Sequence, residues 1–118
     1  MKNKIKKIVI FLVVLLISFN VFATSFYSGN DLKRKVNSTD PFESGFSYGY
    51  ISAVSDSLYK SRISGFQMCL PKEVELGQLI DVVKIFLDTH PNLLHFTASS
   101  LVAKALQDAY PCSQKNSR

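Results

Sequence analysis

Residues 69–112 read CLPKEVELGQLIDVVKIFLDTHPNLLHFTASSLVAKALQDAYPC, and this stretch decides the fold. Apolar residues recur at helical spacing from residue 76 to residue 89 or 90, where Pro91 disfavours helical geometry in the residue before it. A second helical pattern runs to residue 109, and Pro111 stops it. The stretch therefore predicts two helices joined by a short turn.

The chain has two cysteines, Cys69 and Cys112, and they lie at the two ends of this stretch. A metal site would need more ligands at shorter spacing, and a redox pair usually has the form Cys-x-x-Cys. A bond between the two would close a loop of about 43 residues, worth about 3–4 kcal/mol in the chain-entropy model. We expect a disulfide that staples the helical hairpin shut.

The first 23 residues have the features of a cleaved signal peptide. Residues 1–7 hold four lysines and no acid, residues 8–19 are apolar, and residues 21–23 read VFA. A membrane anchor is the alternative, but the apolar run is shorter than the roughly 20 residues a spanning helix needs. We expect cleavage after Ala23 and export of a mature domain of residues 24–118.

The formal net charge of +5 includes the four lysines of this leader. Residues 24–118 keep about +1, which gives no reason to expect a nucleic-acid or anionic-membrane partner. A domain of about 95 residues buries a modest core, so a disulfide formed in an oxidising compartment would help to stabilise it.

Residues 40–59 are expected to form another helix, with Asp40 as its N-cap and Pro41 in the first turn. One face of it is apolar, through Phe42, Phe46, Tyr50, Val54 and Leu58. A second strip is small or polar, through Gly45, Gly49, Ser52 and Asp56. This strip would either admit another backbone or simply face solvent.

The remaining segments complete an all-α prediction. Residues 31–38 allow at most a short helix, and residues 61–68 form a loop with Phe66 and Met68 as anchors in the core. No run alternates apolar and polar residues between turn signals, so we expect no strand. The expected fold is a small disulfide-stapled bundle of three to four helices.

No catalytic constellation is found in the sequence. His90 and His95, with Asp88, could form a metal site or a general base, but histidines at a helix end more often cap carbonyls. The serines lie in no nucleophile motif, and no glycine-rich phosphate loop follows a strand. We expect a binding protein with no catalytic residue, metal, cofactor or small-molecule substrate.

Residues 69–112 resemble the Rap/Tai family of immunity proteins through Cys-Leu-Pro, a Leu-x-x-His-Pro turn and a closing Pro-Cys. The segment GYISAVSD at residues 49–56 resembles another family motif, although Glu75 and Ala53 depart from the common residues. The resemblance implies a periplasmic homodimer without enzymatic activity. Such a protein blocks a peptidoglycan amidase delivered by type VI secretion, with a protruding loop that plugs the catalytic groove.

The helix predicted at residues 76–89 also points to a homodimer. It is apolar almost all round, through Ile80, Val82, Ile85 and Phe86, and a small monomer has few helices to cover every side.

A general periplasmic helical binding protein or an acid-stress chaperone is the alternative function.

Two loops could contact a partner, at residues 61–68 and 91–96. The second is short and held by the stapled helices, and we expect Asn92, Leu93, Leu94 and His95 to form the partner-binding surface. In the alternative interpretation the two leucines close the core and His95 caps the last helix.

Overall fold

The computed structural model describes residues 1–17, 26–59 and 61–113. These residues form five α-helices and one 3-10 helix, with no strand among them; in chain order they are α1 (Lys2–Ile17), α2 (Gly29–Val36), α3 (Pro41–Leu58), α4 (Leu76–Thr89), η1 (Pro91–Leu93) and α5 (Ala98–Ala109). The predicted all-α class is confirmed, and α2 is the short additional helix.

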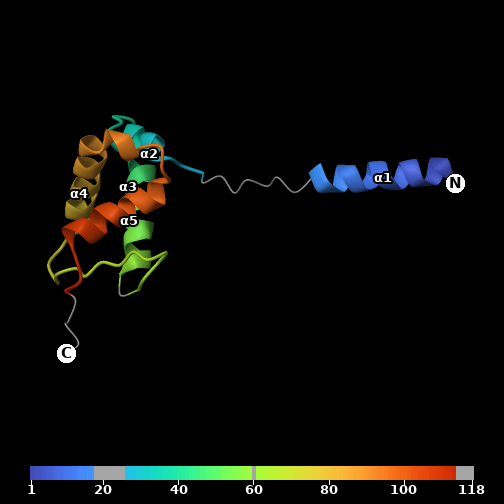
Figure 1. The fold of residues 1–118 in the computed structure, drawn as a ribbon. Helices are drawn as coiled ribbons and strands as arrows, with labels where there is room; N and C mark the ends of the chain where they lie inside the picture. The colour runs from blue at the N-terminus through green and yellow to red at the C-terminus, as the bar shows by residue number, and fades with distance from the viewer. Residues whose placement is uncertain (18–25, 60, 114–118) are drawn as a thin grey trace, which may run out of the picture.

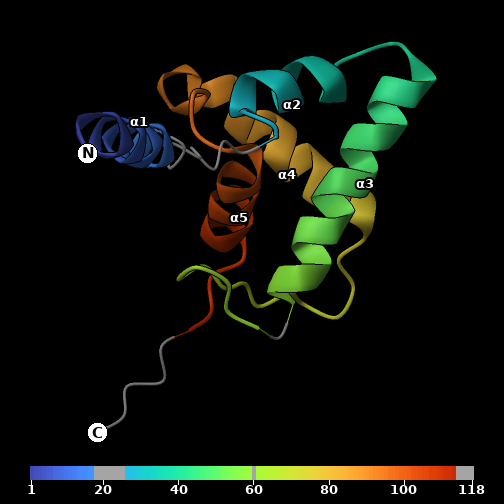
Figure 2. The ribbon, with the colours of Figure 1, turned by 90° about the vertical axis from the view of Figure 1, so that its right-hand side faces the viewer.

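Helices α2 to α5 pack around one core, whereas α1 stands apart from them (Figure 1). In both views α2 lies across the end of the bundle where α4 joins α5, and residues 61–68 lie at the opposite end (Figure 2). The core is mostly aliphatic, and its most deeply buried large side chains are Leu32, Ile51, Leu58, Leu87 and Leu106. Met68 is buried and Phe66 half-buried, as expected of the two anchors.

Helix α1 carries the apolar run of the proposed signal peptide, and its apolar side chains from Ile5 to Val14 are exposed. Within the described ranges, no helix combines the length and hydrophobicity that crossing a bilayer requires. The expected cleavage site after Ala23 lies outside the described residues.

The helix starts follow the capping residues that the sequence shows. The Asp40 carboxylate accepts hydrogen bonds from the backbone N–H groups of Phe42 and Glu43, at 2.9 and 3.0 Å. At the start of α4, the Gln78 side chain accepts from the backbone N–H of Glu75 at 2.8 Å. Side-chain oxygens thus satisfy N–H groups that have no partner within the helix.

The buried face of α3 differs from the predicted apolar stripe. Ser47, Ile51, Ser55 and Leu58 point into the core, whereas Phe42 is 80% exposed. Burying the two serines costs little, because their hydroxyls donate to carbonyl groups of the same helix at 2.8 and 2.7 Å. Their small side chains let α3 pack closely against its neighbours.

The stripe prediction is therefore correct for Leu58 and for Tyr50 and Val54, which are half-buried against the core, and it is wrong for Phe42. Phe46 lies at the edge of the bundle, where its ring packs against Tyr27 with 5.1 Å between centroids. Gly45 and Gly49 are exposed, and a Cβ added to either would meet no other atom within 4 Å. Within this chain, Gly45, Gly49 and Asp56 of this strip are exposed, whereas Ser52 is half-buried.

Helix α4 is better covered than the sequence suggests. Ile80 and Phe86 are buried in the core of the same chain and Val82 is half-buried, whereas Ile85 is 63% exposed. The chain itself therefore supplies most of the cover that the sequence argument assigned to a second copy.

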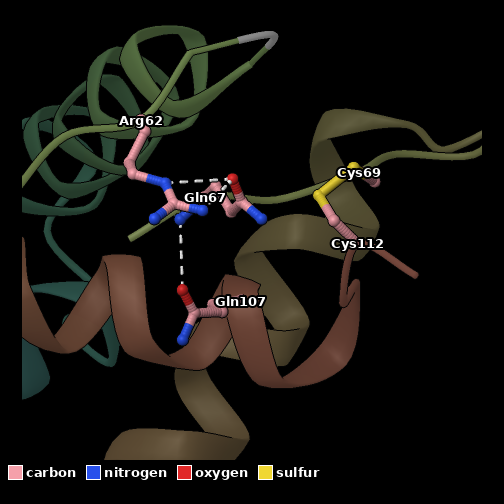
Figure 3. Close-up of a disulfide and its surroundings, with 5 residues drawn as sticks. All are labelled: Arg62, Gln67, Cys69, Gln107 and Cys112. Atoms are coloured by element: carbon pink, nitrogen blue, oxygen red, sulfur yellow. Dashed lines mark hydrogen bonds between the residues drawn. A yellow bond between two sulfur atoms is a disulfide. The ribbon is translucent and has the colours of Figure 1, made fainter. Parts of the chain in front are cut away.

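The predicted disulfide between Cys69 and Cys112 is present (Figure 3). Beside it, the backbone N–H of Cys69 donates to the carbonyl oxygen of Tyr110 at 3.0 Å. The segment before α4 is thus fixed to the end of α5 by a covalent bond and a hydrogen bond.

We predict that Cys112→Ser lowers the free energy of unfolding by about 2–5 kcal/mol, because the denatured chain regains the freedom that the cross-link removes. Urea unfolding of the oxidised parent and the variant measures the difference. Equal midpoints would show that the disulfide does not stabilise the fold.

Candidate protein-binding site

The turn between α4 and α5 holds the four residues that the sequence singled out. The carbonyl oxygens of His90 and Leu93 accept hydrogen bonds within it, each at 3.0 Å, from the backbone N–H groups of Leu93 and Phe96. Leu94 is 7% exposed and belongs to the core, and Leu93 is half-buried. Of the four, Asn92 and His95 are exposed and Leu93 is partly so, and the flanking Pro91 and Phe96 are exposed as well.

Helix α2 holds the turn in place through the backbone. The N–H of Gly29 donates to the carbonyl of Phe96 at 2.9 Å. The backbone N–H and the side-chain amide of Asn30 both donate to the carbonyl of Leu94, at 3.0 and 3.2 Å. Helix α2 therefore fixes the backbone of the turn, while the side chains of Asn92 and His95 stay exposed to solvent.

This contact requires glycine at position 29. A Cβ on Gly29 would lie 2.9 Å from the Cα of Leu94 and 2.3 Å from a methyl carbon of Leu101. The leucine side chain can move, but the backbone of the turn cannot yield without shifting the loop. Sequence reasoning missed Gly29, because a lone glycine before a short helix is also an ordinary helix-start residue.

The start of α2 is itself held by a capping box between Ser28 and Asp31. The backbone N–H and the hydroxyl of Ser28 donate to the Asp31 carboxylate at 3.0 and 2.8 Å, and they hold the pKa of that carboxyl below its ordinary value. A lowered folded-state pKa adds stability above the ordinary pKa, and this stability is lost as the pH falls through the folded value. Strong acid thus loosens the support of the turn.

The two histidines have different surroundings. The Nδ1 atom of His90 lies 2.9 Å from the carbonyl oxygen of Phe86, and the imidazole stacks on the ring of Phe86 with 4.1 Å between centroids. His90 therefore caps the end of α4. His95 is exposed beside Phe96, and Thr97, not His95, caps α5. Within the described ranges, no group of three potential ligands is placed to hold a metal ion.

The loop at residues 61–68 forms a tight hairpin. Ile63 and Phe66 exchange two backbone hydrogen bonds, at 2.9 and 2.8 Å. Between them Ser64 and Gly65 have positive φ angles of 48° and 86°, as a two-residue hairpin turn requires. The side chains at residues 61–65 are exposed, so the hairpin is a second ordered loop on the surface.

These features define a small, disulfide-bonded, all-α domain with two ordered surface loops. Its residues 28–112 match the family of Rap1a immunity proteins, and this match spans most of the chain. The chain therefore belongs to that family, and the resemblance seen in the sequence is confirmed. Membership implies a protein partner, a secreted effector, and an inhibitory role without catalysis. No curated protein matches the chain.

We predict that Gly29→Ala destabilises the fold by about 1–3 kcal/mol, because the added methyl group overpacks the contact between α2 and the turn. The matched control is Gly77→Ala in α4, where an added Cβ meets no atom within 4 Å. Thermal melting followed by circular dichroism compares the two variants. Equal melting temperatures would show that the turn accommodates the added methyl group without loss of stability.

Proposed function

We propose that this chain is a periplasmic immunity protein that binds a type VI secretion peptidoglycan amidase and occludes its active-site groove. The observation that carries the proposal is the family match over residues 28–112. The disulfide supports an oxidising compartment, because such bonds persist outside the cytosol. The basic start and apolar run of α1 support export, with residues 1–23 removed as a signal peptide.

The test of this function is direct inhibition. The mature protein, residues 24–118, is mixed with candidate amidases, and cleavage of peptidoglycan stem peptides is measured. The expected result is loss of cleavage at an equimolar ratio with one of the enzymes. An amidase panel that cleaves at full rate in its presence, although the protein is folded, would count against the proposal.

The turn between α4 and α5 is the surface we propose for this contact. Asn92 and His95 project from a backbone that α2 fixes, so binding orders few additional groups. Leu94 supports the turn from within the core, and Leu93 contributes through its exposed part. The proposed contact residues are therefore Asn92, His95 and Leu93, with Leu94 beneath them.

We predict that Asn92→Asp and His95→Ala each weaken inhibition of the amidase, because both side chains lie on the proposed surface. Leu93→Glu should weaken it too, but this variant needs a melting control, because Leu93 is half-buried. Glu73→Lys, an exposed change in the segment before α4, is the matched control. If the Asn92→Asp and His95→Ala variants have the parent's inhibition constant, the turn does not contact the amidase.

We also propose that the protein is a homodimer. Large apolar side chains stay exposed within one chain, including Phe42 on α3 and Ile85 on α4. A symmetric second copy would bury some of this surface, and self-complementary dimers are the commonest protein oligomers.

We predict that light scattering of the mature protein at micromolar concentration gives twice the monomer mass, and that Ile85→Lys shifts it toward the monomer. A lysine at an apolar interface would lose its hydration without gaining a partner. Glu73→Lys again serves as control. A monomer mass for the parent would contradict the proposal.

A further inference from the structure

A groove of about 430 Å³ opens between α3, the start of α5 and the hairpin. Its lining is apolar where Tyr50, Val54 and Phe66 meet, and Leu58 and Ala103 lie buried beneath. The groove extends to Thr97, which directly follows the turn that carries Asn92 and His95. One end of the groove therefore lies next in the chain to the turn proposed as the effector contact.

None of the described residues that line the groove carries a charge. Its polar groups are hydroxyls, and those of Ser64 and Ser99 make no hydrogen bond within the described part of the chain. An ionised side chain that entered would lose water and find no opposite charge among these described lining residues, which makes its entry costly. An apolar side chain would gain from burial, and the two free hydroxyls can bond the backbone that presents it.

The hairpin wall of the groove is braced. The Arg62 guanidinium donates two hydrogen bonds to the Gln67 side-chain oxygen, at 2.8 and 3.1 Å. The backbone N–H of Gln67 donates to the side-chain oxygen of Gln107 on α5 at 3.1 Å (Figure 3). The disulfide then fixes the chain two residues further on. A ligand would meet a wall that is already ordered, so binding costs less conformational entropy.

We infer that this groove receives an uncharged, apolar side chain from a loop of the effector. The inference rests on the proposed function, since it concerns the same protein partner. It adds a reciprocal contact: the turn reaches into the effector, and the effector reaches into the groove between α3 and α5. The shape of the groove, the cost of desolvating a polar side chain, and hydrogen bonds to the hydroxyls of Ser64 and Ser99 then select the residue that enters.

The test uses an amidase that the unmodified protein inhibits, with binding measured by calorimetry. Ala53 lies exposed on α3 at the groove. Ala53→Glu places a charge there and Ala53→Trp fills the space, and each should weaken binding by roughly tenfold or more. Gly45→Glu, on the same helix but outside the groove, should bind like the parent. Ala53 variants that are folded and bind like the parent would overturn the inference.

The opposite wall provides an independent arm. Ser99→Glu on α5 also places a charge in the groove, and it should weaken binding even if a change at Ala53 disturbs folding. Gln107→Ala removes one brace of the hairpin, and it should reduce affinity by a smaller factor than the charged variants. If Ser99→Glu binds at full strength, the groove is not used. If the unmodified protein inhibits no amidase, the proposed function fails first, and the two failures are thus distinguished.

Discussion

The bond between Cys69 and Cys112 is the constraint on which the described bundle depends. It joins the segment before α4 to the end of α5, so these two helices and their turn form a closed loop. The hairpin leads directly into Cys69, and the Gln67 contact with Gln107 lies two residues before the bond. In a domain with a modest core, one cross-link thus holds the helical pair and orders the loop that precedes it.

The sequence predicted those features that depend on local chemistry. Asp40 and Pro41 marked the start of α3, Pro91 marked the end of α4, and the two cysteines proved to be partners. The helix ends follow from the effect of a capping residue or a proline on the adjacent backbone. The disulfide follows because the sequence has two cysteines. The all-α class followed from the helical spacing of apolar residues, whereas the predicted count of three to four helices is approximate.

The features that were missed depend on contacts between distant segments. The inward face of α3 is set by how closely Ser47 and Ser55 let other helices approach, and hydrophobic periodicity gives a serine no preference for the core. Gly29 matters because the backbone of Leu94 lies against it, 65 positions later in the chain. In the candidate site, exposure separates Asn92 and His95 from Leu94, and the spacing of residues in a turn does not encode exposure.

The described residues that line the groove between α3 and α5 carry no charge, and this has a kinetic consequence for a partner bound there. Long-range attraction between proteins comes from ionised groups and speeds their encounter, whereas apolar contacts act only once the surfaces meet. An apolar side chain that entered the groove would therefore add little to the encounter rate or to its dependence on salt. Its burial would instead lengthen the residence time of the complex. In the reciprocal contact proposed above, the groove would slow the release of the effector and would not speed its capture.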